Sequence, residues 1–555
     1  MVTEESQMIC PSQHSAPQAY DISWHSIDWK RCRRIVTSLQ ARIVKARKAG
    51  KHHKVKALQW LLTHSFSGKA LSIRRVTENR GKNTPGVDGV IWDTPEKKQQ
   101  ALTTLCRQGY HASPSKRIYI PKANGERMPL GIPTMRDRAM EALHLLSLDP
   151  VAETVAALHS YGFRRYRSCA DAITQCHIVL AGKHRPEYIF EADIRGCFDH
   201  ISHEWLLAHV PMDKKLLRIW LNAGILDRGQ FSPTDEGTPQ GGIISPVLMN
   251  LTLDGLEEVL TACGVKRDRT GKIAANPWKL NLIRYADDFI ITGVSREVLE
   301  TQVKPRVVTF LAERGLTLSE EKTTISHIED GFSFLGQHIR KYRGKVIITP
   351  AKKNVKALLT KVRQTIKQSA TVKAATLIQS LNPSIRGWAN YHRHISAKQT
   401  FSRVDAAIQC ALWRWAKRRH KAKSARWIRK KYWKPVGTRQ SVFADTVDGR
   451  LVSLRQASET RIRRHAKIES ARNPYAREDR DYFAQRTRTQ MKRTLTPGRW
   501  SIWRTQGGIC PLCHEPITEE REWELHHKDG EHTNQRLTNL VFLHNNCHRR
   551  ITAEV

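Results

Sequence analysis

The sequence is poor in acidic residues and has no long apolar run. Its 555 residues include 52 Asp and Glu against 93 Lys and Arg, which gives a formal net charge of +41. A folded chain this basic favours a polyanionic partner, most often nucleic acid, and argues against glycolytic-type enzymes and secreted hydrolases. No run of about 18 or more apolar residues is present, so the sequence predicts no membrane partner.

Cysteine is also scarce and unevenly placed. The eleven cysteines are an odd number, with one C-x-x-C pair at Cys510 and Cys513. The first residues, MVTEESQMICPSQHS, lack a basic start followed by an apolar block, so no export signal is predicted. This pattern favours a reducing cytoplasm and a local metal site over a disulfide framework.

The length predicts three or four domains, because a single hydrophobic core rarely serves 555 residues. Apolar residues at helical spacing over residues 24–72 predict two amphipathic helices joined near Gly50. Between about 115 and 350, short β-type runs alternate with helical stretches, and residues 297–314 and 353–367 are expected to be helical. This alternation predicts a mixed α and β domain.

Three aspartates mark the candidate catalytic chemistry of that domain. Asp287 and Asp288 fall at the tip of a predicted hairpin, where an Asp pair is by itself usually turn chemistry. Asp193, however, ends an apolar strand 94 residues before Asp287. Carboxylates at the ends of adjacent strands can hold two Mg²⁺ ions, which activate a 3′-hydroxyl and stabilise departing pyrophosphate. The sequence therefore predicts a nucleotidyl-transfer site.

The motifs around these aspartates resemble those of reverse transcriptases. FEADIRGCFD, residues 190–199, resembles the first catalytic motif, and YADD, residues 285–288, resembles the second. TPQGGIISP, residues 238–246, resembles the nucleotide-site motif between them. GLTL from residue 315, followed by FLG at 334–336, matches the later palm motifs in the family's order. More narrowly, the chain resembles the proteins encoded by bacterial group II introns.

This resemblance implies roles for residues of the catalytic and nucleotide-site motifs. The catalytic aspartates would be Asp193, Asp287 and Asp288. Two Mg²⁺ ions would be held by Asp193, Ile194 and Asp287. Phe198 would block a 2′-hydroxyl and so select deoxynucleotides, and Gln240 would line the site of the incoming dNTP.

A fingers segment, IPKANGER, resembles the part of the family that grips the triphosphate. The resemblance implies Lys122 and Arg127, whose charge and geometry suit phosphate. The family usually has Arg directly before Pro-Leu-Gly-Ile-Pro, whereas this chain has Met128 there. Arg136 or Arg117 could therefore take the place of Arg127.

Residues 351–440 combine basic and aromatic side chains. They contain 23 Lys and Arg and a single acid, Asp405. Eight aromatic residues lie among them: Trp388, Tyr391, Phe401, Trp413, Trp415, Trp427, Tyr432 and Trp433. Such interleaving suits RNA binding through phosphate neutralisation and base stacking, and it also suits a helical bundle with a tryptophan core. We expect mixed use, with four residues mainly structural: Leu381, Trp388, Ile408 and Leu412.

The segments LNPSIRGW and WRW within this region resemble the maturase domain of the same family. That resemblance implies binding of the chain's own intron RNA and assistance to its splicing. Residues 441–500 correspond in position to the family's DNA-binding segment. The main evidence for DNA binding by these residues is their positive charge.

The C-terminal residues include two closely spaced pairs of side chains that commonly bind metal ions. Cys510 and Cys513, together with His544 and Cys547, supply four ligands at zinc-finger spacing and predict a structural Zn²⁺ site. The alternative interpretation is a set of buried thiols beside a surface histidine.

Between and beside these pairs, ELHH, Asn539 and His548 resemble the HNH (ββα-metal) nuclease motif. The resemblance implies that His527 is the general base, that His526 and His548 bind a divalent ion, and that Asn539 fixes the loop carrying His527. Many nucleases of this class have a further histidine after the last one, whereas Arg549 follows here, so water or another side chain would complete the metal shell.

The predicted fold is an α+β multidomain chain with right-hand polymerase fingers and palm, a helical thumb and a small ββα-metal domain with zinc knuckles. The expected divisions are a flexible tail (1–23), N-terminal extension and fingers (24–190), palm (191–350), thumb or maturase domain (351–440), a basic DNA-binding region (441–500) and the HNH domain (501–555).

The predicted protein binds its intron RNA, assists splicing, nicks target DNA and copies the intron into cDNA from dNTPs, the sequence of events known as retrohoming. We expect a bacterial cytoplasmic location, with nucleoid association when DNA is engaged. Two alternatives stay open: a maturase whose polymerase has decayed, and an RNA-dependent RNA polymerase, which Phe198 disfavours.

Overall fold

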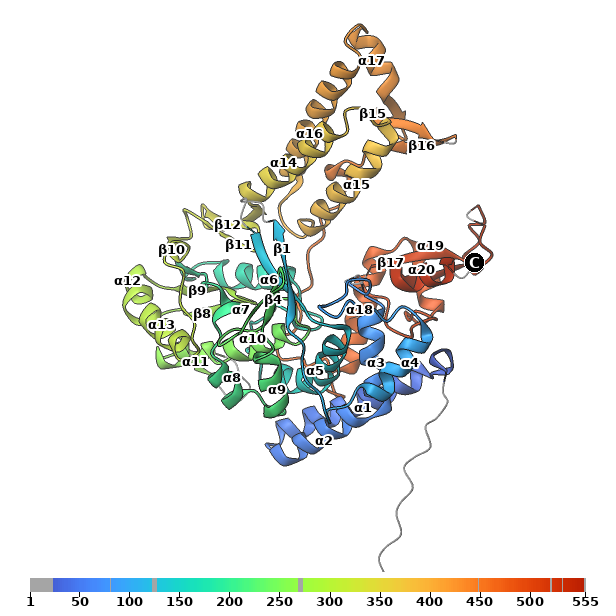
Figure 1. The fold of residues 1–555 in the computed structure, drawn as a ribbon. Coiled ribbons are helices and arrows are strands. Elements are labelled where there is room, and N and C mark those ends of the chain that lie inside the picture. Colours follow the sequence, from blue (N-terminus) through green and yellow to red (C-terminus); the bar gives the residue numbers. More distant parts are fainter. Residues whose placement is uncertain are drawn as a thin grey trace, which may run out of the picture.

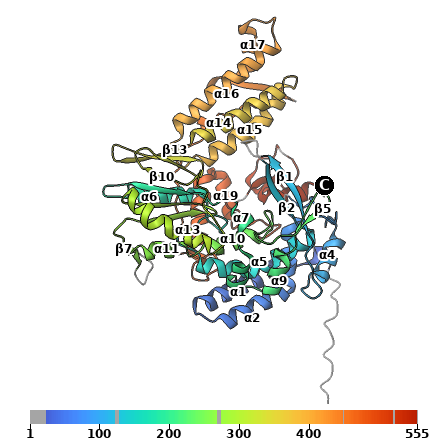
Figure 2. The ribbon, with the colours of Figure 1, turned by 60° about the vertical axis from the view of Figure 1, so that its left-hand side comes forward.

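The computed structural model describes residues 23–79, 81–121, 127–267, 273–447, 449–519, 522–531 and 533–553 (Figure 1). The predicted tail before residue 23 and Lys122 lie outside these described residues. Four thumb helices project from a body made of the N-terminal helices, two sheets and the palm helices (Figures 1 and 2). The C-terminal elements lie beside the N-terminal helices, although the two are far apart in sequence.

The N-terminal part is helical. Its elements are η1 (Trp24–Ser26), α1 (Trp29–Lys48), α2 (His52–His64), α3 (Phe66–Thr77) and α4 (Pro95–Thr104). Gly50, at a φ of 68°, follows α1 as the sequence predicted. The prediction of two helices over 24–72 is wrong, because Ser65 ends α2 and its side chain caps α3 by accepting from the Gly68 N–H. Helix α5 (Met135–Val155) packs against α1, α2 and α3.

The fingers contain a four-stranded sheet in the order β2-β1-β4-β5. Its strands are β1 (Ser115–Pro121), β2 (Arg127–Ile132), β4 (Ile225–Asp227) and β5 (Gln230–Ser232). Strand β1 pairs antiparallel with β2 and parallel with β4.

The palm contains a four-stranded sheet in the order β10-β3-β9-β8. The expected division between fingers and palm at residue 190 differs from this arrangement, because β3 begins at Tyr188 and because β4 and β5, after residue 190, pair with the fingers strands. Its strands are β3 (Tyr188–Ala192), β8 (Asn281–Tyr285), β9 (Asp288–Gly293) and β10 (Thr324–His327), and a small hairpin pairs β6 (Lys266–Arg267) with β7 (Ile273–Ala275). The palm helices are α6 (Cys169–Leu180), α7 (Cys197–His200), α8 (His203–His209), α9 (Lys214–Leu221), α10 (Ser245–Leu253), α11 (Leu256–Ala262), α12 (Arg296–Val298), the π-helical η2 (Leu299–Val303) and α13 (Lys304–Ala312).

Both faces of the palm sheet are buried, which explains its nearly continuous apolar strands. Phe190 and Ile291 belong to a core shared with α5 and α10, whereas Ile189 and Ile290 belong to a core shared with α6 and the thumb. The strand period of two alternates these residues between the two cores. The sheet is thereby fixed in register, with Ala192 opposite Phe289 and Tyr285 opposite Asp288.

A three-stranded sheet, β11 (Phe332–Phe334), β12 (Gln337–Tyr342) and β13 (Lys345–Pro350), leads into the thumb. The thumb contains α14 (Lys352–Gln368), α15 (Ala374–Tyr391), α16 (Lys398–Arg419), α17 (Ala425–Tyr432) and a sheet of β14 (Trp433–Val436), β15 (Arg439–Val447) and β16 (Arg450–Ser453). Leu381, Ile408 and Leu412 are buried in its core, and Trp388 packs against that core half-buried, as expected of structural residues.

Residues 454–479, called the strap below, run from the thumb back across the palm and include η3 (Ala457–Glu459). The Ile468 N–H donates to the buried Asp171 carboxylate at 2.7 Å, and Arg167 donates to the Ser470 carbonyl at 3.0 Å. The strap then reaches α1, where Lys48 and Glu478 form an ion pair at 2.7 Å.

The C-terminal part has its own apolar core. Its elements are α18 (Arg480–Thr494), α19 (Pro497–Thr505), β17 (Trp523–His527), η4 (Leu537–Asn539), β18 (Leu540–His544) and α20 (Asn545–Ala553). Strands β17 and β18 form an antiparallel pair and α20 follows at once. Among the helices of the described ranges, none combines the length and apolar character that crossing a bilayer requires.

Candidate active site and metal centre

The β8–β9 hairpin presents the Asp pair through a two-residue turn. Tyr285 and Asp288 face each other in the ladder, and Ala286 takes a φ of 60° in the turn. Gly162 lies so close to this turn that a Cβ on it would collide with the Ala286 backbone. Small residues on both sides therefore allow the turn to rest directly on the chain beneath it.

Asp193 reaches the same edge of the sheet from β3. Because Ala192, the last residue of β3, lies opposite Phe289, Asp193 follows beside the start of β9. The Asp193 carbonyl accepts from the Ser319 N–H at 2.8 Å, and its carboxylate accepts from Lys322 Nζ at 3.0 Å. Ile194, which follows, forms a bridge with Leu318. The later palm motif thus holds the end of β3 in place.

The three carboxylates repel one another. Burial, followed by the charges of Asp287 and Asp193, raises the pKa of Asp288 to about 6. Burial and the charge of Asp193 also raise the pKa of Asp287. Such a cluster of hard oxygen donors gains stability from a divalent cation, so the residues fit Mg²⁺.

A buried arginine that the sequence analysis did not single out supports the hairpin from below. Arg284 is fully buried, and its Nη2 donates to Asp254 Oδ1 at 2.5 Å. Its Nη1 donates to the Asn250 side chain at 3.0 Å and to the Ala286 carbonyl at 3.3 Å. A charged residue inside the apolar strand NLIRY was the available signal, because a buried charge requires a dedicated partner.

The nucleotide-site loop is fixed between the palm and the fingers. The Thr238 N–H donates to the Phe198 carbonyl at 2.7 Å, and the Gly131 N–H donates to the Gln240 carbonyl at 2.6 Å. The Gln240 side chain donates to Asp199 at 3.4 Å. Gly241 has a φ of 116°, and a Cβ there would collide with the Gly131 carbonyl. The loop that carries Gln240 is therefore bonded to helix α7, which carries Phe198.

Glu141 on α5 anchors this loop and was also missed by the sequence analysis. The carboxylate is buried and accepts from the Ile243 and Ile244 N–H groups at 2.5 and 3.3 Å. Burial raises its pKa to about 7. Nothing near Glu141 in the sequence signals this contact, because its partners lie about a hundred residues away.

The candidate triphosphate residues lie on and beside the fingers sheet. Arg127 begins β2, opposite Pro121, and its side chain is exposed. Arg117 on β1 is half-buried. The Arg136 guanidinium lies 5.3 Å from the centre of the Tyr110 ring.

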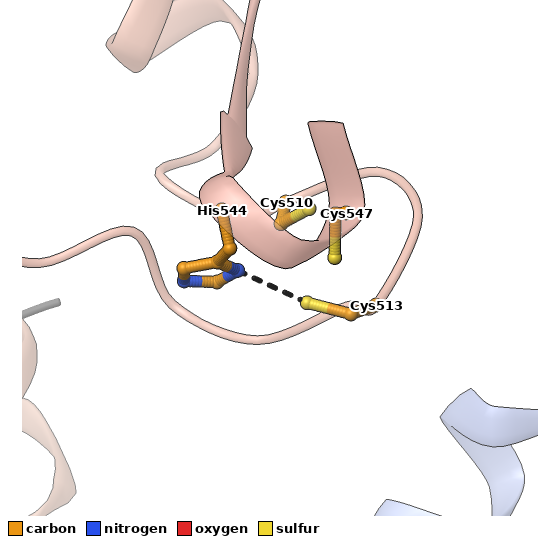
Figure 3. A group of neighbouring side chains, drawn as sticks. All are labelled: Cys510, Cys513, His544 and Cys547. Carbon is orange, nitrogen blue, oxygen red and sulfur yellow. Dashed lines mark hydrogen bonds between the residues drawn. The ribbon is translucent and has the colours of Figure 1, made fainter. Parts of the chain in front are cut away.

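The C-terminal part gathers four metal-ligand side chains (Figure 3). One ligand atom from each of Cys510, Cys513, His544 and Cys547 lies within 4.8 Å of the other three. Cys513 Sγ and His544 Nδ1 are 3.2 Å apart. Three cysteines and one histidine make a soft, four-ligand set of the kind that holds Zn²⁺. This cluster could bind zinc.

The nuclease-like residues lie on the neighbouring hairpin. The rings of His526 and His548 are centred 5.1 Å apart, and His548 Nδ1 lies 3.2 Å from Glu524 Oε2. His527, the last residue of β17, contacts the Gln535 amide at 3.1 Å. The structure brings His526 and His548 together.

Asn539 closes the loop that follows His527. Its side-chain amide donates to Asp529 at 2.9 Å and to the Asn534 carbonyl at 3.1 Å, while its side-chain oxygen accepts from the Asp529 N–H at 3.2 Å. Its backbone carbonyl also accepts from the Lys528 N–H at 2.9 Å. These bonds connect residues 528, 529 and 534 to Asn539.

Comparison with known families assigns the N-terminal, palm and thumb regions. Residues 24–105 match the N-terminal domain of reverse transcriptase, residues 120–339 match reverse transcriptase (RNA-dependent DNA polymerase), and residues 355–433 match the group II intron maturase-specific domain. The fold and its site therefore define a reverse transcriptase.

Similar proteins narrow this class. Protein YkfC of Escherichia coli K12 is 32% identical over 309 residues, which cover 50% of this chain and 81% of that protein. The group II intron-encoded protein LtrA of Lactococcus lactis is 29% identical, and the match covers 50% of this chain and 55% of LtrA. A telomerase structure from Candida albicans is similar at a TM-score of 0.34 and 10% identity, covering 58% of this chain and 65% of the telomerase chain. The chain belongs to the bacterial group II intron reverse transcriptase/maturase family.

Proposed function

We propose that this protein binds the RNA of its own group II intron, assists its splicing, nicks target DNA through its C-terminal domain and copies the intron RNA into cDNA. The working particle is then a cytoplasmic ribonucleoprotein that moves to the nucleoid when it engages DNA. The observation that supports polymerisation is the cluster of Asp193, Asp287 and Asp288 at one edge of the palm sheet. In this cluster burial and the charge of Asp193 raise the pKa of both other aspartates.

In polymerisation, Asp193, Asp287 and the backbone carbonyl of Ile194 would hold the two Mg²⁺ ions, which activate the primer 3′-hydroxyl and stabilise the leaving pyrophosphate when bound. Asp288 adds negative charge beside them. Phe198 excludes a ribose 2′-hydroxyl by its bulk, and Gln240 lines the nucleotide site. Lys122 and Arg127 neutralise the triphosphate from the fingers.

The nuclease part is supported by the β17–β18–α20 order and by the pairing of His526 with His548. These two side chains, with Glu524 beside them, would hold a divalent ion at the scissile phosphate. His527 removes a proton from the attacking water, and Asn539 shapes the loop behind His527. Zn²⁺ in the four-residue cluster would hold the domain together.

RNA binding is supported by the match of the thumb to the maturase-specific domain and by its charge. Helix α17 exposes Arg426, Arg429, Lys430 and Lys431, and the Lys431 ammonium lies 4.9 Å from the centre of the Trp427 ring. Exposed cations beside a 37% exposed tryptophan offer phosphate and base contacts together.

Primer extension on an RNA template tests the polymerase assignment. A DNA primer should be extended with dNTPs and far less with rNTPs, because Phe198 discriminates by size. Substitution Phe198→Ala should admit rNTPs, whereas Phe231→Ala, at an exposed ring of the fingers sheet, should not. Equal use of rNTPs by the unaltered enzyme would identify an RNA polymerase instead.

A further inference from the structure

The C-terminal part lies against the N-terminal helices through polar contacts (Figure 1). A cavity of about 1100 Å³ separates much of the two surfaces. Its lining includes Arg33, Arg74 and Glu78 from the helices and Glu515 and Asn546 from the C-terminal part. The apolar core of the C-terminal part shares no described residue with the cores that contain α1 and α3. The described apolar residues therefore do not lock the two parts together.

Three ion pairs attach the C-terminal part to the rest of the chain at separate points. They are Arg33–Glu515 at 2.6 Å, Arg550–Glu78 at 3.0 Å and Arg393–Glu519. The partners outside the C-terminal part lie on α1, at the end of α3 and directly after thumb helix α15. Three separate points of attachment determine the orientation of a rigid body, whereas a single point leaves it free to rotate.

Helix α18 makes the covalent connection between the two parts. Phe483, near its start, belongs to the core of the palm and thumb, whereas Met491, near its end, belongs to the core of the C-terminal part. One helix holds one point of the C-terminal part, and bending at its end would turn the direction in which that part faces. The three ion pairs oppose this bending.

Helix α20 uses different faces for docking and for the nuclease-like residues. The Asn546 amide donates to the Glu78 carbonyl, and Arg550 lies one helical turn further along the same face. His548 lies between these two residues in sequence, and its ring is centred 5.1 Å from that of His526 on β17. Residues two apart on a helix point in different directions. Docking on α3 therefore leaves the face of His548 directed at the hairpin.

The surface that receives the C-terminal part is continuous with the palm. Ala70, Ile73 and Val76 of α3 belong to the same apolar core as Phe190 of β3 and Ile291 of β9. These two strands lead to the catalytic aspartates. Interiors packed in this way deform little, so a domain held on α3 is held at a fixed place relative to the polymerase site.

We propose that the three ion pairs hold the nuclease domain at one position relative to the palm and so determine where along the target DNA the nick falls. The inference rests on the proposed function, in which the palm and the nuclease domain act on the same DNA. The palm supplies one reference point on that DNA, and the docked domain cuts at a constant distance from it. Arg33, Glu78 and Arg393 are thus positioning residues that act through the domain they hold.

The test maps nicks to single nucleotides on an end-labelled target duplex, with the protein bound to its intron RNA. The unaltered protein should cut at one main position. Partly exposed ion pairs are individually weak, so R33E/E78Q disrupts two of them and should lower the share of nicks at the main position by about twofold or more. Both substitutions lie outside the C-terminal part, so zinc content should stay unchanged. Small-angle X-ray scattering of the protein alone should show a larger radius of gyration.

A charge swap separates docking from a loss of stability. E515R alone should spread the nicks as R33E does, and R33E/E515R should restore the main position, because the pair forms again with its charges exchanged. R34E is the matched control, since it makes the same change at the exposed neighbour of Arg33 on α1. The nicks of R34E should stay at the main position.

A spread of nicks in R33E/E78Q no larger than in R34E would overturn the proposal. So would a swap variant whose nicks are as widely spread as those of R33E and E515R. Should R33E lower the zinc content, E78Q alone provides the same test, because Glu78 pairs with Arg550 and not with Glu515. If the unaltered protein nicks no target DNA, the proposed function itself fails, which is a distinct result.

Discussion

The palm site and the C-terminal cluster are opposite solutions to holding a metal ion. The palm uses carboxylates at a sheet edge, where Asp287 lies in the β8–β9 turn, and burial and the Asp287 charge raise the pKa of Asp288, the next residue. The C-terminal cluster uses soft ligands, and Cys510, Cys513 and Cys547 are buried. Hard oxygen donors suit Mg²⁺ ions that exchange with solvent and also bind phosphate oxygens. Thiolates suit a Zn²⁺ ion that remains bound.

The difference shows in what supports each site. The palm turn is held by Arg284 and by its sheet, so the site keeps its shape without a cation. The C-terminal cluster joins the turn at 510–513 to the junction of β18 and α20, and a small apolar core surrounds it. Removal of Mg²⁺ should therefore abolish polymerisation reversibly, whereas removal of Zn²⁺ should unfold the C-terminal part.

The largest expected effect is that of Cys547→Ser. Structural zinc contributes on the order of 10 kcal/mol to the folding of small zinc domains, so this change should abolish zinc binding and open the C-terminal part to protease. DNA nicking should disappear, while extension of a short paired primer survives. Zinc content by mass spectrometry and limited proteolysis measure this. Cys410→Ser, at an exposed thumb cysteine, is the control. Full zinc content in the Cys547 variant would show that the cluster is not the zinc site.

Asp287→Ala should come next, with cDNA synthesis reduced by about 10³-fold or more. Loss of a metal ligand removes several kcal/mol of transition-state stabilisation. RNA-assisted splicing should stay largely intact, because the RNA contacts proposed for it lie on the thumb and not on the palm carboxylates. Both reactions are measured on labelled RNA, with Asp330→Ala at an exposed position as the control. Loss of splicing in a folded variant would contradict the separation of the two sites.

His527→Ala should reduce nicking by about 10²-fold, within the range that a general base contributes. Polymerisation and zinc content should stay unchanged, since His527 is outside the cluster. A labelled DNA duplex measures the nick, and His177→Ala on α6 is the exposed control. Unchanged nicking would remove the assignment of His527 as the base.

The smallest effect concerns stability and pH. The pKa of Asp288 is raised to about 6 by burial and by its two neighbours, so the folded state holds this proton more tightly than the unfolded state. Without Mg²⁺ and with the zinc cluster loaded, stability should therefore fall as pH rises from about 4 to about 6. Under these conditions Asp288→Asn should raise Tm at pH 7 by about 2 °C and flatten this pH dependence. Asp330→Asn should do neither, and a lower Tm for Asp288→Asn would contradict the repulsion.

Local patterns were enough to predict the hairpin at Tyr285, the helices at 297–314 and 353–367, and the membership of the family. Each of these depends on residues close in sequence or on a motif. The break at Ser65 was missed because its only signal is one capping hydroxyl inside an apolar pattern.

Long-range contacts could not be predicted. Glu141 meets its loop, and Arg463 meets Arg393 through a backbone hydrogen bond of 2.8 Å, only after the domains have packed. The strap has little regular structure, so no period marks it in the sequence. Charge alone suggested nucleic-acid binding there.

The buried guanidinium of Arg284 has a final consequence for the order of events. Its partners, Asn250, Asp254 and the carbonyl of Ala286, all lie within the palm. Folding of this one domain thus positions the turn before any nucleotide, cation or strand arrives. The catalytic turn is therefore ordered before substrates bind. The conformational entropy lost in ordering it is lost during folding and not in each catalytic cycle.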